Sequence, residues 1–203
     1  VLSFIVTLFW IVGLTNAINW IDGLDGLAAG VSTISIVGFL IIFSSLNRQD
    51  LAIYCASICG ASVGFLRYNF YPAKILMGDG GSYFLGSSLG VLSIVGLSTN
   101  DQIINSSSSF NIFPFHIAIL LLFLPIVDMA LVILERLFNG DSPFYPDKRH
   151  LHHKILGTGL NQRSTVIIFY AISQFFVVIS ICFYNIDQQL TLLCISINLV
   201  VLA

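Results

Sequence analysis

Long apolar runs with almost no charge dominate this chain. Seven of them approach the length of about 20 residues that a helix needs to cross a bilayer; they are residues 1–17, 27–46, 51–67, 82–98, 113–137, 164–184 and 188–203. Charged residues make up only 9% of the chain and hydrophobic residues 57%, whereas about a quarter of a soluble domain is charged. The sequence therefore predicts an all-α, polytopic membrane helix bundle of about seven transmembrane helices, forming a single domain over residues 1–203.

Composition also argues against two other classes of protein. The formal net charge is −2, and no basic patch is large enough to follow a phosphate backbone, so nucleic acid is not an expected partner. All four cysteines lie inside apolar runs, where a free thiol behaves as a small hydrophobic side chain and a disulfide framework is not expected; they are Cys55, Cys59, Cys182 and Cys194.

Basic residues are distributed unevenly among the connections between the runs. If the seven runs alternate across the membrane, the connections 18–26, 68–81 and 138–163 share one side. The side that holds these three connections, counted with the adjoining span ends, has seven of the eight basic residues: Arg67, Lys74, Arg136, Lys148, Arg149, Lys154 and Arg163. The opposite side holds only Arg48. By the positive-inside rule, the three connections are expected to face the cytoplasm from the plasma (inner) membrane.

The first of these connections carries a regular series of polar side chains. In NAINWIDGLDGLAAG, residues 16–30, the polar residues Asn16, Asn19, Asp22 and Asp25 recur every three positions. This spacing keeps neighbours close on a helix surface, and the glycines that follow predict a helix end opening into a loop. One Asp would be enough to cap the next helix, so four oxygen-bearing side chains favour a binding site over simple capping.

The second connection ends in GDGGS, residues 78–82, which places Asp79 among glycines directly before a predicted helix. Glycines allow close backbone approach, and a helix N-terminus offers free N–H groups to an anion. A carboxylate here would repel a phosphate unless a cation lay between them, which suggests Mg²⁺ bridging Asp79 to a phosphate. An ordinary Asp-Gly turn before a helix is the alternative.

The third connection concentrates basic side chains in PDKRHLHHK. It contains three of the four histidines, His150, His152 and His153, beside lysine and arginine neighbours. A zinc site is disfavoured because the cysteines lie elsewhere and no His-Glu-x-x-His pattern occurs. Imidazole and cationic donors suit a diphosphate better; a solvated basic loop that only sets the membrane topology is the alternative.

Two carboxylates fall inside the run 113–137, where ionisable groups are costly. Glu135 lies near the cytoplasmic end and is expected to reach the interface or to pair with Arg136. Asp128 lies about two turns deeper, close to Pro125. Asp128 either supports the site or satisfies backbone groups that the proline leaves without partners; the sequence does not separate these roles.

Three segments, in this order, resemble the polyprenyl-phosphate N-acetylhexosamine-1-phosphate transferases, glycosyltransferase family 4: NAINWIDGLDGLAAG, NFYPAKILMGDGGSYFLG and SPFYPDKRHLHHKILGTGL. The resemblance spans about residues 1–185. It is closest to the bacterial undecaprenyl-phosphate GlcNAc-1-phosphate transferase branch, because the pattern His150-Leu-His152-His153 is similar to that branch, whereas the related phospho-MurNAc-pentapeptide translocases tend to carry three consecutive histidines.

The resemblance implies a Mg²⁺-dependent enzyme, with Mn²⁺ as an alternative metal, that transfers GlcNAc-1-phosphate or a related sugar-1-phosphate from a UDP-sugar to a polyprenyl phosphate and releases UMP. Membrane lipid surrounds such an enzyme, and a homodimer is a further expectation. The implied site consists of the metal ligands Asn19 and Asp79, the catalytic carboxylates Asp22, Asp25 and again Asp79, Asn69 in the uridine pocket, and the diphosphate or sugar-phosphate binders His150, His152 and His153.

One departure from the family pattern affects the expected activity. The family carries an adjacent Asp-Asp pair and several spans in an earlier part of the chain, and this sequence contains no Asp-Asp. The chain is therefore expected to be the C-terminal part of a larger family domain that does not catalyse transfer alone. Two further classes stay open: a catalytically inactive fragment or membrane scaffold, and a secondary transporter. Transporter sites lie near the membrane midplane, whereas these clusters lie at one interface.

Overall fold

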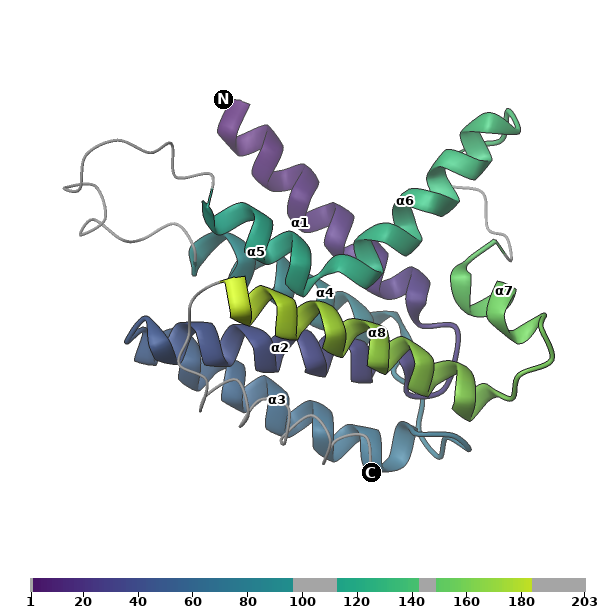
Figure 1. Cartoon of the computed structure of the whole chain (residues 1–203), viewed down its shortest axis with the longest axis horizontal. Helices are drawn as coiled ribbons and strands as arrows, with labels where there is room; N and C mark the ends of the chain where they lie inside the picture. Colours follow the sequence, from purple (N-terminus) through teal and green to yellow (C-terminus); the bar gives the residue numbers. More distant parts are fainter. Residues whose placement is uncertain (1, 97–112, 143–148, 184–203) are drawn as a thin grey trace.

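The computed structural model describes residues 2–96, 113–142 and 149–183. The predicted span 188–203 lies outside the described residues, as does Lys148 of the third cluster. The described residues form helices and no strand, as predicted: α1 (Leu2–Ile21), α2 (Leu27–Ser45), α3 (Gln49–Asn69), α4 (Gly78–Val95), α5 (Phe113–Leu121), α6 (Phe123–Phe138), α7 (Leu151–Leu156) and α8 (Gln162–Phe183) (Figure 1).

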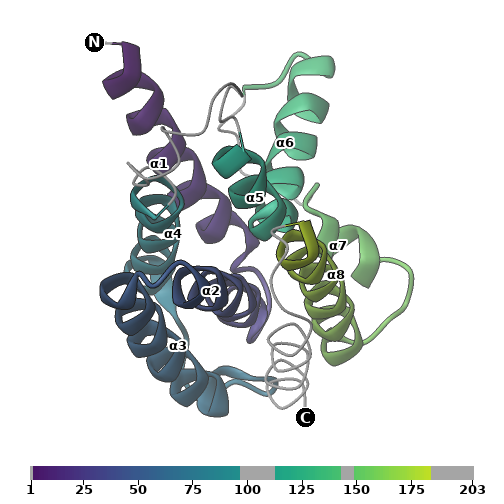
Figure 2. The same ribbon diagram turned by 60° about the vertical axis from the view of Figure 1, so that its left-hand side comes forward.

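Helix α2 forms the centre of the bundle. Viewed almost end-on, it is surrounded by α1, α3, α4, α5 and α8 (Figure 2). Its residues 27–39 are all buried, which agrees with a sequence that is apolar around the whole helix. Within the described part of the chain, four helices are long and apolar enough to cross a membrane: α1, α2, α3 and α8. These features confirm the predicted polytopic helix bundle.

Helix α4 packs closely against α1 through its glycines. A Cβ atom added to Gly86 would lie 2.7 Å from Cα of Thr15, and one added to Gly90 would lie 3.2 Å from Cα of Ile11. Small residues allow such close approach of two helix backbones. The glycines of α4 therefore allow its close packing on α1, although the opposite face of α4 is exposed at Phe84.

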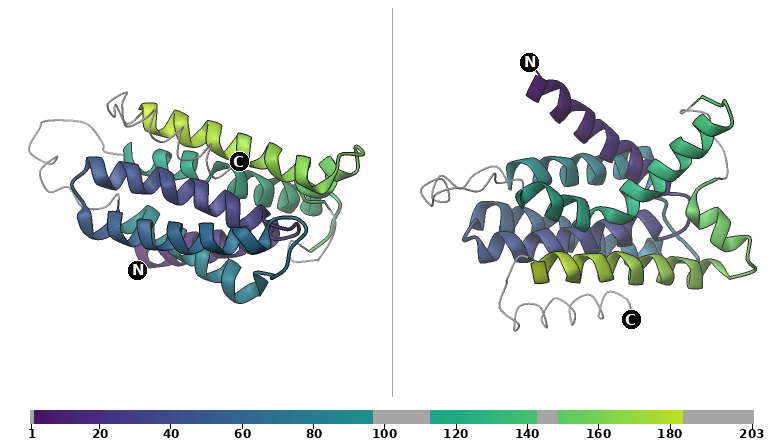
Figure 3. Two further views of the ribbon diagram at one scale, coloured as in Figure 1. Left: turned by 90° about the horizontal axis from the view of Figure 1, so that it is seen from below. Right: turned by 45° about the horizontal axis from the view of Figure 1, so that its top comes forward.

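The run 113–137, which the sequence predicts as one span, is not one continuous helix in the structure. The run divides at Leu122 into α5 and α6, and α6 leaves the bundle at an angle (Figure 3). The physical reason is Pro125, which has no N–H and therefore cannot bond the carbonyl of Leu121, four residues earlier. The hydroxyl of Ser35 on α2 donates to this carbonyl instead, at 2.7 Å.

The three polar connections lie at the same end of the bundle. Residues 22–26 join α1 to α2, residues 70–77 join α3 to α4, and α7 follows α6, all on the right in Figure 1. The short turn between α2 and α3 lies at the opposite end. The helix directions therefore agree with the alternation predicted from the sequence.

Ser35→Ala tests the compensation at the break between α5 and α6. We expect the free energy of unfolding to fall by about 1 kcal/mol, because the carbonyl of Leu121 loses its donor and hydrogen bonds between membrane helices contribute about this much. Reversible unfolding in detergent micelles measures the change. Ser32→Ala is the matched control, since the Ser32 hydroxyl is buried on the same helix without a hydrogen-bond partner. Equal stability of the Ser35→Ala and Ser32→Ala variants would contradict the assignment.

Candidate active site

The first two polar clusters meet through Asn19 and Asp79. Asn19 lies in the last turn of α1, and Asp79 lies in the first turn of α4. The Asn19 amide Nδ2 donates to Oδ1 of Asp79 at 3.1 Å and to Oγ of Ser82 at 2.9 Å. The two residues expected as metal ligands are therefore neighbours, although 60 positions separate them. GDGGS forms the first turn of α4 instead of preceding it, which corrects the placement expected from the sequence.

The loop 22–26 is held from both sides at Gly26. This residue has φ 79°, a left-handed conformation that favours glycine. Its N–H donates to Oδ1 of Asn69 on α3 at 3.0 Å, and its carbonyl accepts the hydroxyl of Tyr170 on α8 at 2.6 Å. The loop that carries the two aspartates thus has a fixed position relative to α3 and α8.

Neither aspartate of this loop caps α2. The residue at the N-cap is Gly26, and no side-chain cap bond is present there. Oδ2 of Asp25 instead accepts the N–H of Ala73 at 3.0 Å, so this carboxylate joins the first connection to the second. The series of polar residues divides as predicted, with Asn19 on the helix end and Asp22 and Asp25 in the loop.

Asn69 is only 3% exposed and uses both ends of its amide. Besides accepting from Gly26, it donates through Nδ2 to the carbonyl of Ile75 at 2.9 Å. Its side chain therefore links the loops 22–26 and 70–77. The placement of Asn69 in a uridine pocket, which the resemblance implies, stays a prediction.

Asp22 lies in a crowded negative environment. Burial, followed by the charges of Asp79 and Asp25, raises the pKa of its carboxyl to about 6. A cation bound near Asp22 would offset the charges of Asp79 and Asp25 and favour the ionised form of its carboxyl.

The described residues contain no cluster of three or more histidine, cysteine, aspartate or glutamate side chains close enough to hold a metal by themselves. A hard cation at Asp79 would therefore complete its ligand set with the Asn19 amide oxygen, waters and substrate oxygens. Mg²⁺ usually keeps several waters and binds one or two carboxylates plus substrate phosphates. The donors at Asn19 and Asp79 fit that pattern.

The histidine cluster is attached to α6 through Asp128. Oδ2 of Asp128 lies 2.7 Å from Nδ1 of His150, and Oδ1 accepts the N–H of Leu151 at 2.7 Å. Ser35 satisfies the carbonyl freed by the proline, so Asp128 has the role of supporting the loop. Glu135 pairs with Lys154 of α7 at 2.6 Å. Of the two roles expected for Glu135, this exposed pair fits the one in which the side chain reaches the interface. The guanidinium of Arg136 lies 5.1 Å from the ring centroid of Trp20.

His152 brings the third cluster to the first. Its side chain is 1% exposed, and a Cβ added to Gly23 would overlap its imidazole ring, so the ring lies directly against the loop 22–26. Among the described residues, neither ring nitrogen has a hydrogen-bond partner. Burial, with the neighbouring His153, lowers its pKa to about 4. His152 is therefore neutral at physiological pH, and the site keeps unused hydrogen-bonding capacity.

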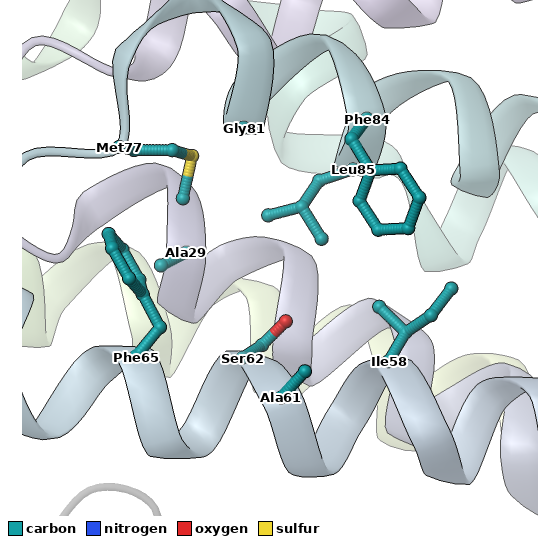
Figure 4. A pocket seen from close by; sticks show the side chains of 9 residues that line it. All are labelled: Ala29, Ile58, Ala61, Ser62, Phe65, Met77, Gly81, Phe84 and Leu85. Carbon is teal, nitrogen blue, oxygen red and sulfur yellow. The ribbon is translucent and has the colours of Figure 1, made fainter.

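A separate cleft of about 180 Å³ lies between α2, α3 and α4 (Figure 4). Ile58, Ala61 and Phe65 of α3 face Gly81, Phe84 and Leu85 of α4 and the preceding Met77 across it, with Ala29 behind them. Ser62 is its single polar lining side chain. This cleft lacks ionisable groups, so the charged chemistry belongs to the polar end of the bundle.

Several supporting residues were not found from the sequence. Ser82 and Trp20 lie inside the quoted motifs, so their position next to polar residues could have drawn attention to them. Tyr170 gave no signal, because it is one aromatic residue in an apolar run. The sequence indicated Arg136 only as a basic residue and a partner of Glu135, yet it is 2% exposed and lies against Trp20.

Comparison with known proteins identifies the family of this chain. Residues 1–97 match the family described as glycosyl transferase family 4. The chain is 40% identical over 175 residues to the probable undecaprenyl-phosphate N-acetylglucosaminyl 1-phosphate transferase of Bacillus subtilis (strain 168), an alignment that covers 86% of this chain and 46% of that protein. The chain belongs to glycosyl transferase family 4, and the predicted family is confirmed.

Two further groups of relatives match the same region. The chain is 37% identical over 180 residues to the decaprenyl-phosphate N-acetylglucosaminephosphotransferase of Mycobacterium tuberculosis (strain ATCC 25618 / H37Rv), covering 83% of this chain and 44% of that protein. It is 35% identical over 182 residues to the phospho-N-acetylmuramoyl-pentapeptide-transferase of Listeria monocytogenes serotype 4b (strain F2365), covering 88% of this chain and 51% of that protein. The chain spans about half the length of the curated relatives it matches.

Gly30→Ala tests the support that α8 gives to the loop 22–26. A Cβ at this position would overlap the ring of Tyr170, so we expect the free energy of unfolding to fall by about 1–3 kcal/mol, as for other overpacked cores. Thermal unfolding in detergent measures the change. Gly60→Ala is the matched control, because a Cβ there meets nothing within 4 Å. Equal stability of the two variants would contradict the close packing of α2 and α8.

Asp22→Asn tests the electrostatics of the loop 22–26. A carboxyl with a folded-state pKa of about 6, above its ordinary 3.8, binds protons more tightly when folded, so the free energy of unfolding falls as pH rises through that interval. Without divalent cations, the variant should therefore melt at a higher temperature than the wild type at pH 7.5, with a smaller difference at pH 4. A difference that does not change with pH would contradict the raised pKa of Asp22.

Proposed function

We propose that the full reading frame containing this chain transfers GlcNAc-1-phosphate from UDP-GlcNAc to a polyprenyl phosphate, releases UMP and so starts the synthesis of a cell-envelope glycan. The observation that carries the proposal is the meeting of the three clusters: Asn19 bonds Asp79, and the ring of His152 lies against Gly23 beside Asp22. The names of the relatives supply the substrate class: a polyprenyl phosphate as acceptor and an N-acetylated sugar phosphate as the transferred group.

The reaction joins two anions, which explains the composition of the site. An oxygen of the lipid phosphate attacks the β-phosphorus of the nucleotide sugar, and the bond from that phosphorus to the bridging oxygen breaks, so that UMP leaves. A bound Mg²⁺ would neutralise charge on the diphosphate. Asn19 and Asp79 would hold this ion, Asp22 and Asp25 would orient its waters and the donor, and His150, His152 and His153 would bind the diphosphate or sugar phosphate.

The membrane arrangement follows from the same proposal. The acceptor phosphate lies at the membrane interface while its hydrocarbon tail stays in lipid, so a site at one end of the bundle suits it. The excess of basic residues at this end supports a cytoplasmic orientation in the plasma (inner) membrane. The identity of the donor sugar, the use of Mn²⁺ and assembly as a homodimer stay predictions.

The two rival classes make different predictions. A secondary transporter would bind its substrate near the midplane, whereas the described polar contacts of Asn19, Asp79 and His152 lie where helices begin or end. An inactive scaffold would contain the clusters and release no UMP. UDP-GlcNAc-dependent release of UMP by the full reading frame therefore separates the transferase from both rivals.

Asp79→Asn tests the proposed cation site. The variant should lower kcat about a hundredfold or more, since loss of one strong electrostatic contact to the transition state costs about 3–4 kcal/mol. A UMP-release assay over a range of Mg²⁺ concentrations measures the effect. Asp50→Asn is the matched control, because this exposed carboxylate pairs with Arg48 at the opposite end of the bundle. A Mg²⁺ response of Asp79→Asn equal to that of the wild type would exclude this role.

Single-cysteine labelling tests the orientation. In a background without native cysteines, a cysteine at Thr158, in the connection before α8, should be protected from an impermeant maleimide added outside intact cells. A cysteine at Gln49, where α3 begins, should react. Both positions are exposed, so permeabilised cells should label both and provide the control. External labelling at Thr158 would reverse the proposed topology.

A further inference from the structure

We infer that Asp128 is a positioning residue that acts through His150: it fixes the tautomer and orientation of the imidazole ring so that Nε2 is the nitrogen available to the donor diphosphate. This inference rests on the proposed function and deepens it. Asp128 was the one intramembrane carboxylate that the sequence could not assign, and the transfer chemistry described above does not use it directly.

The geometry around Asp128 is that of a carboxylate engaged by two donors. Asp128 is 1% exposed, and its two oxygens bind Nδ1 of His150 and the N–H of Leu151, each at 2.7 Å. These distances are typical of hydrogen bonds to a charged acceptor. The bond to Leu151 fixes the backbone at the start of α7, and the bond to His150 fixes the ring. The same carboxylate therefore sets both the place of the loop and the direction of the imidazole.

The hydrogen-bonding partner determines which nitrogen of the ring carries the proton. An ionised carboxylate can only accept, so Nδ1 of His150 must donate, and Nε2 becomes the nitrogen available to a ligand. Among the described residues, Asp128 is the only hydrogen-bond partner of the His150 ring. An asparagine in place of Asp128 would present its NH₂ group to Nδ1, provided that its oxygen keeps the N–H of Leu151. The neutral ring would then shift its proton to Nε2.

The surroundings of His150 keep the ring from turning. The Trp20 ring lies against it in a T-shaped arrangement, with ring centroids 5.9 Å apart, and the guanidinium of Arg136 covers the Trp20 ring. The ring of His152 stacks on the His150 ring, with ring centroids 5.6 Å apart, and His152 in turn lies against Gly23. His150 is therefore separated from the loop of Asp22 by a single imidazole, which places it at the same site as the carboxylates.

A double-mutant cycle in the full reading frame tests whether Asp128 acts through His150. Asp128→Asn should lower kcat/KM for UDP-GlcNAc about tenfold to a hundredfold, which is the usual effect of removing a partner that orients a functional histidine, with the KM for polyprenyl phosphate unchanged. His150→Ala should have a similar effect. In the His150→Ala background, Asp128→Asn should change kcat/KM less than twofold, because the two residues form one unit. Additive effects, or wild-type kinetics of Asp128→Asn, would overturn the inference.

Glu135→Gln is the matched control for the attachment of α7. Glu135 lies on the same helix as Asp128 and pairs with Lys154 of α7, but both side chains are well exposed, and exposed ion pairs contribute little. This variant should keep wild-type kinetics. A loss equal to that of Asp128→Asn would show that attachment of α7, and not orientation of the ring, is what matters, and would overturn the inference.

A second measurement separates failure of this inference from failure of the proposed donor. Diethyl pyrocarbonate modification of His150, followed by mass spectrometry, is carried out with and without Mg²⁺ and inorganic pyrophosphate, so the probe contains neither sugar nor lipid. Pyrophosphate should slow the modification several-fold in the wild type and in Glu135→Gln, and this protection should be lost in Asp128→Asn. Protection that persists in Asp128→Asn, or that is absent from the wild type, overturns the inference. A wild type that shows protection but releases no UMP refutes only the proposed transfer reaction.

Discussion

The polar end of this bundle depends on the two hydrogen bonds made by the backbone of Gly26. Asn69 of α3 accepts its N–H and Tyr170 of α8 donates to its carbonyl, and all three residues are buried. Buried backbone groups without partners are costly, especially where lipid replaces water. These bonds therefore fix a loop that would otherwise have a choice of conformations, and the positions of Asp22 and Asp25 follow from that constraint.

In the proposed reaction, the charges at this end act on an anionic substrate and a cation together. Burial and the charges of Asp79 and Asp25 together raise the pKa of Asp22. The histidine loop lies beside them, yet the nearest imidazole, that of His152, is kept neutral by burial. The neutral imidazole of His152 therefore does not neutralise the carboxylates. In the proposed reaction, a bound cation has this role. Nearby basic side chains pair elsewhere: Lys154 with Glu135, and Arg149 with Asp141.

Helix α6 connects the membrane part of the bundle to the histidine loop. Asp128, Val132 and Arg136, spaced four residues apart, are buried on one face, while Leu134 and Leu137 are exposed on the other. The break at Leu122 turns α6 away from α5 and so brings its polar face to the loop. A straight helix through the same residues would have continued in the direction of α5, and the bond from Ser35 to the freed carbonyl stabilises the broken form.

The sequence by itself determined that the chain lies in a lipid bilayer, that its fold is an all-helical bundle, and that the three polar clusters lie at one end. Apolar runs of membrane length require backbone groups to be satisfied within helices, and the alternation of such helices places every second connection on the same side. The resemblance also identified the family and placed Asn19 and Asp79 at one site, and the two side chains are in contact in the structure.

Only the tertiary structure decided which side chains touch. Pro125 was visible in the sequence, but the run around it is apolar throughout, so the pattern alone did not show that the helix breaks there. The bond of Asp128 to His150, the position of His152 against Gly23 and the support of Gly26 by Tyr170 join residues that are 22 to 144 positions apart. Periodicity records the environment of a residue and not the identity of its neighbour, because contacts between helices depend on how the whole bundle packs around α2.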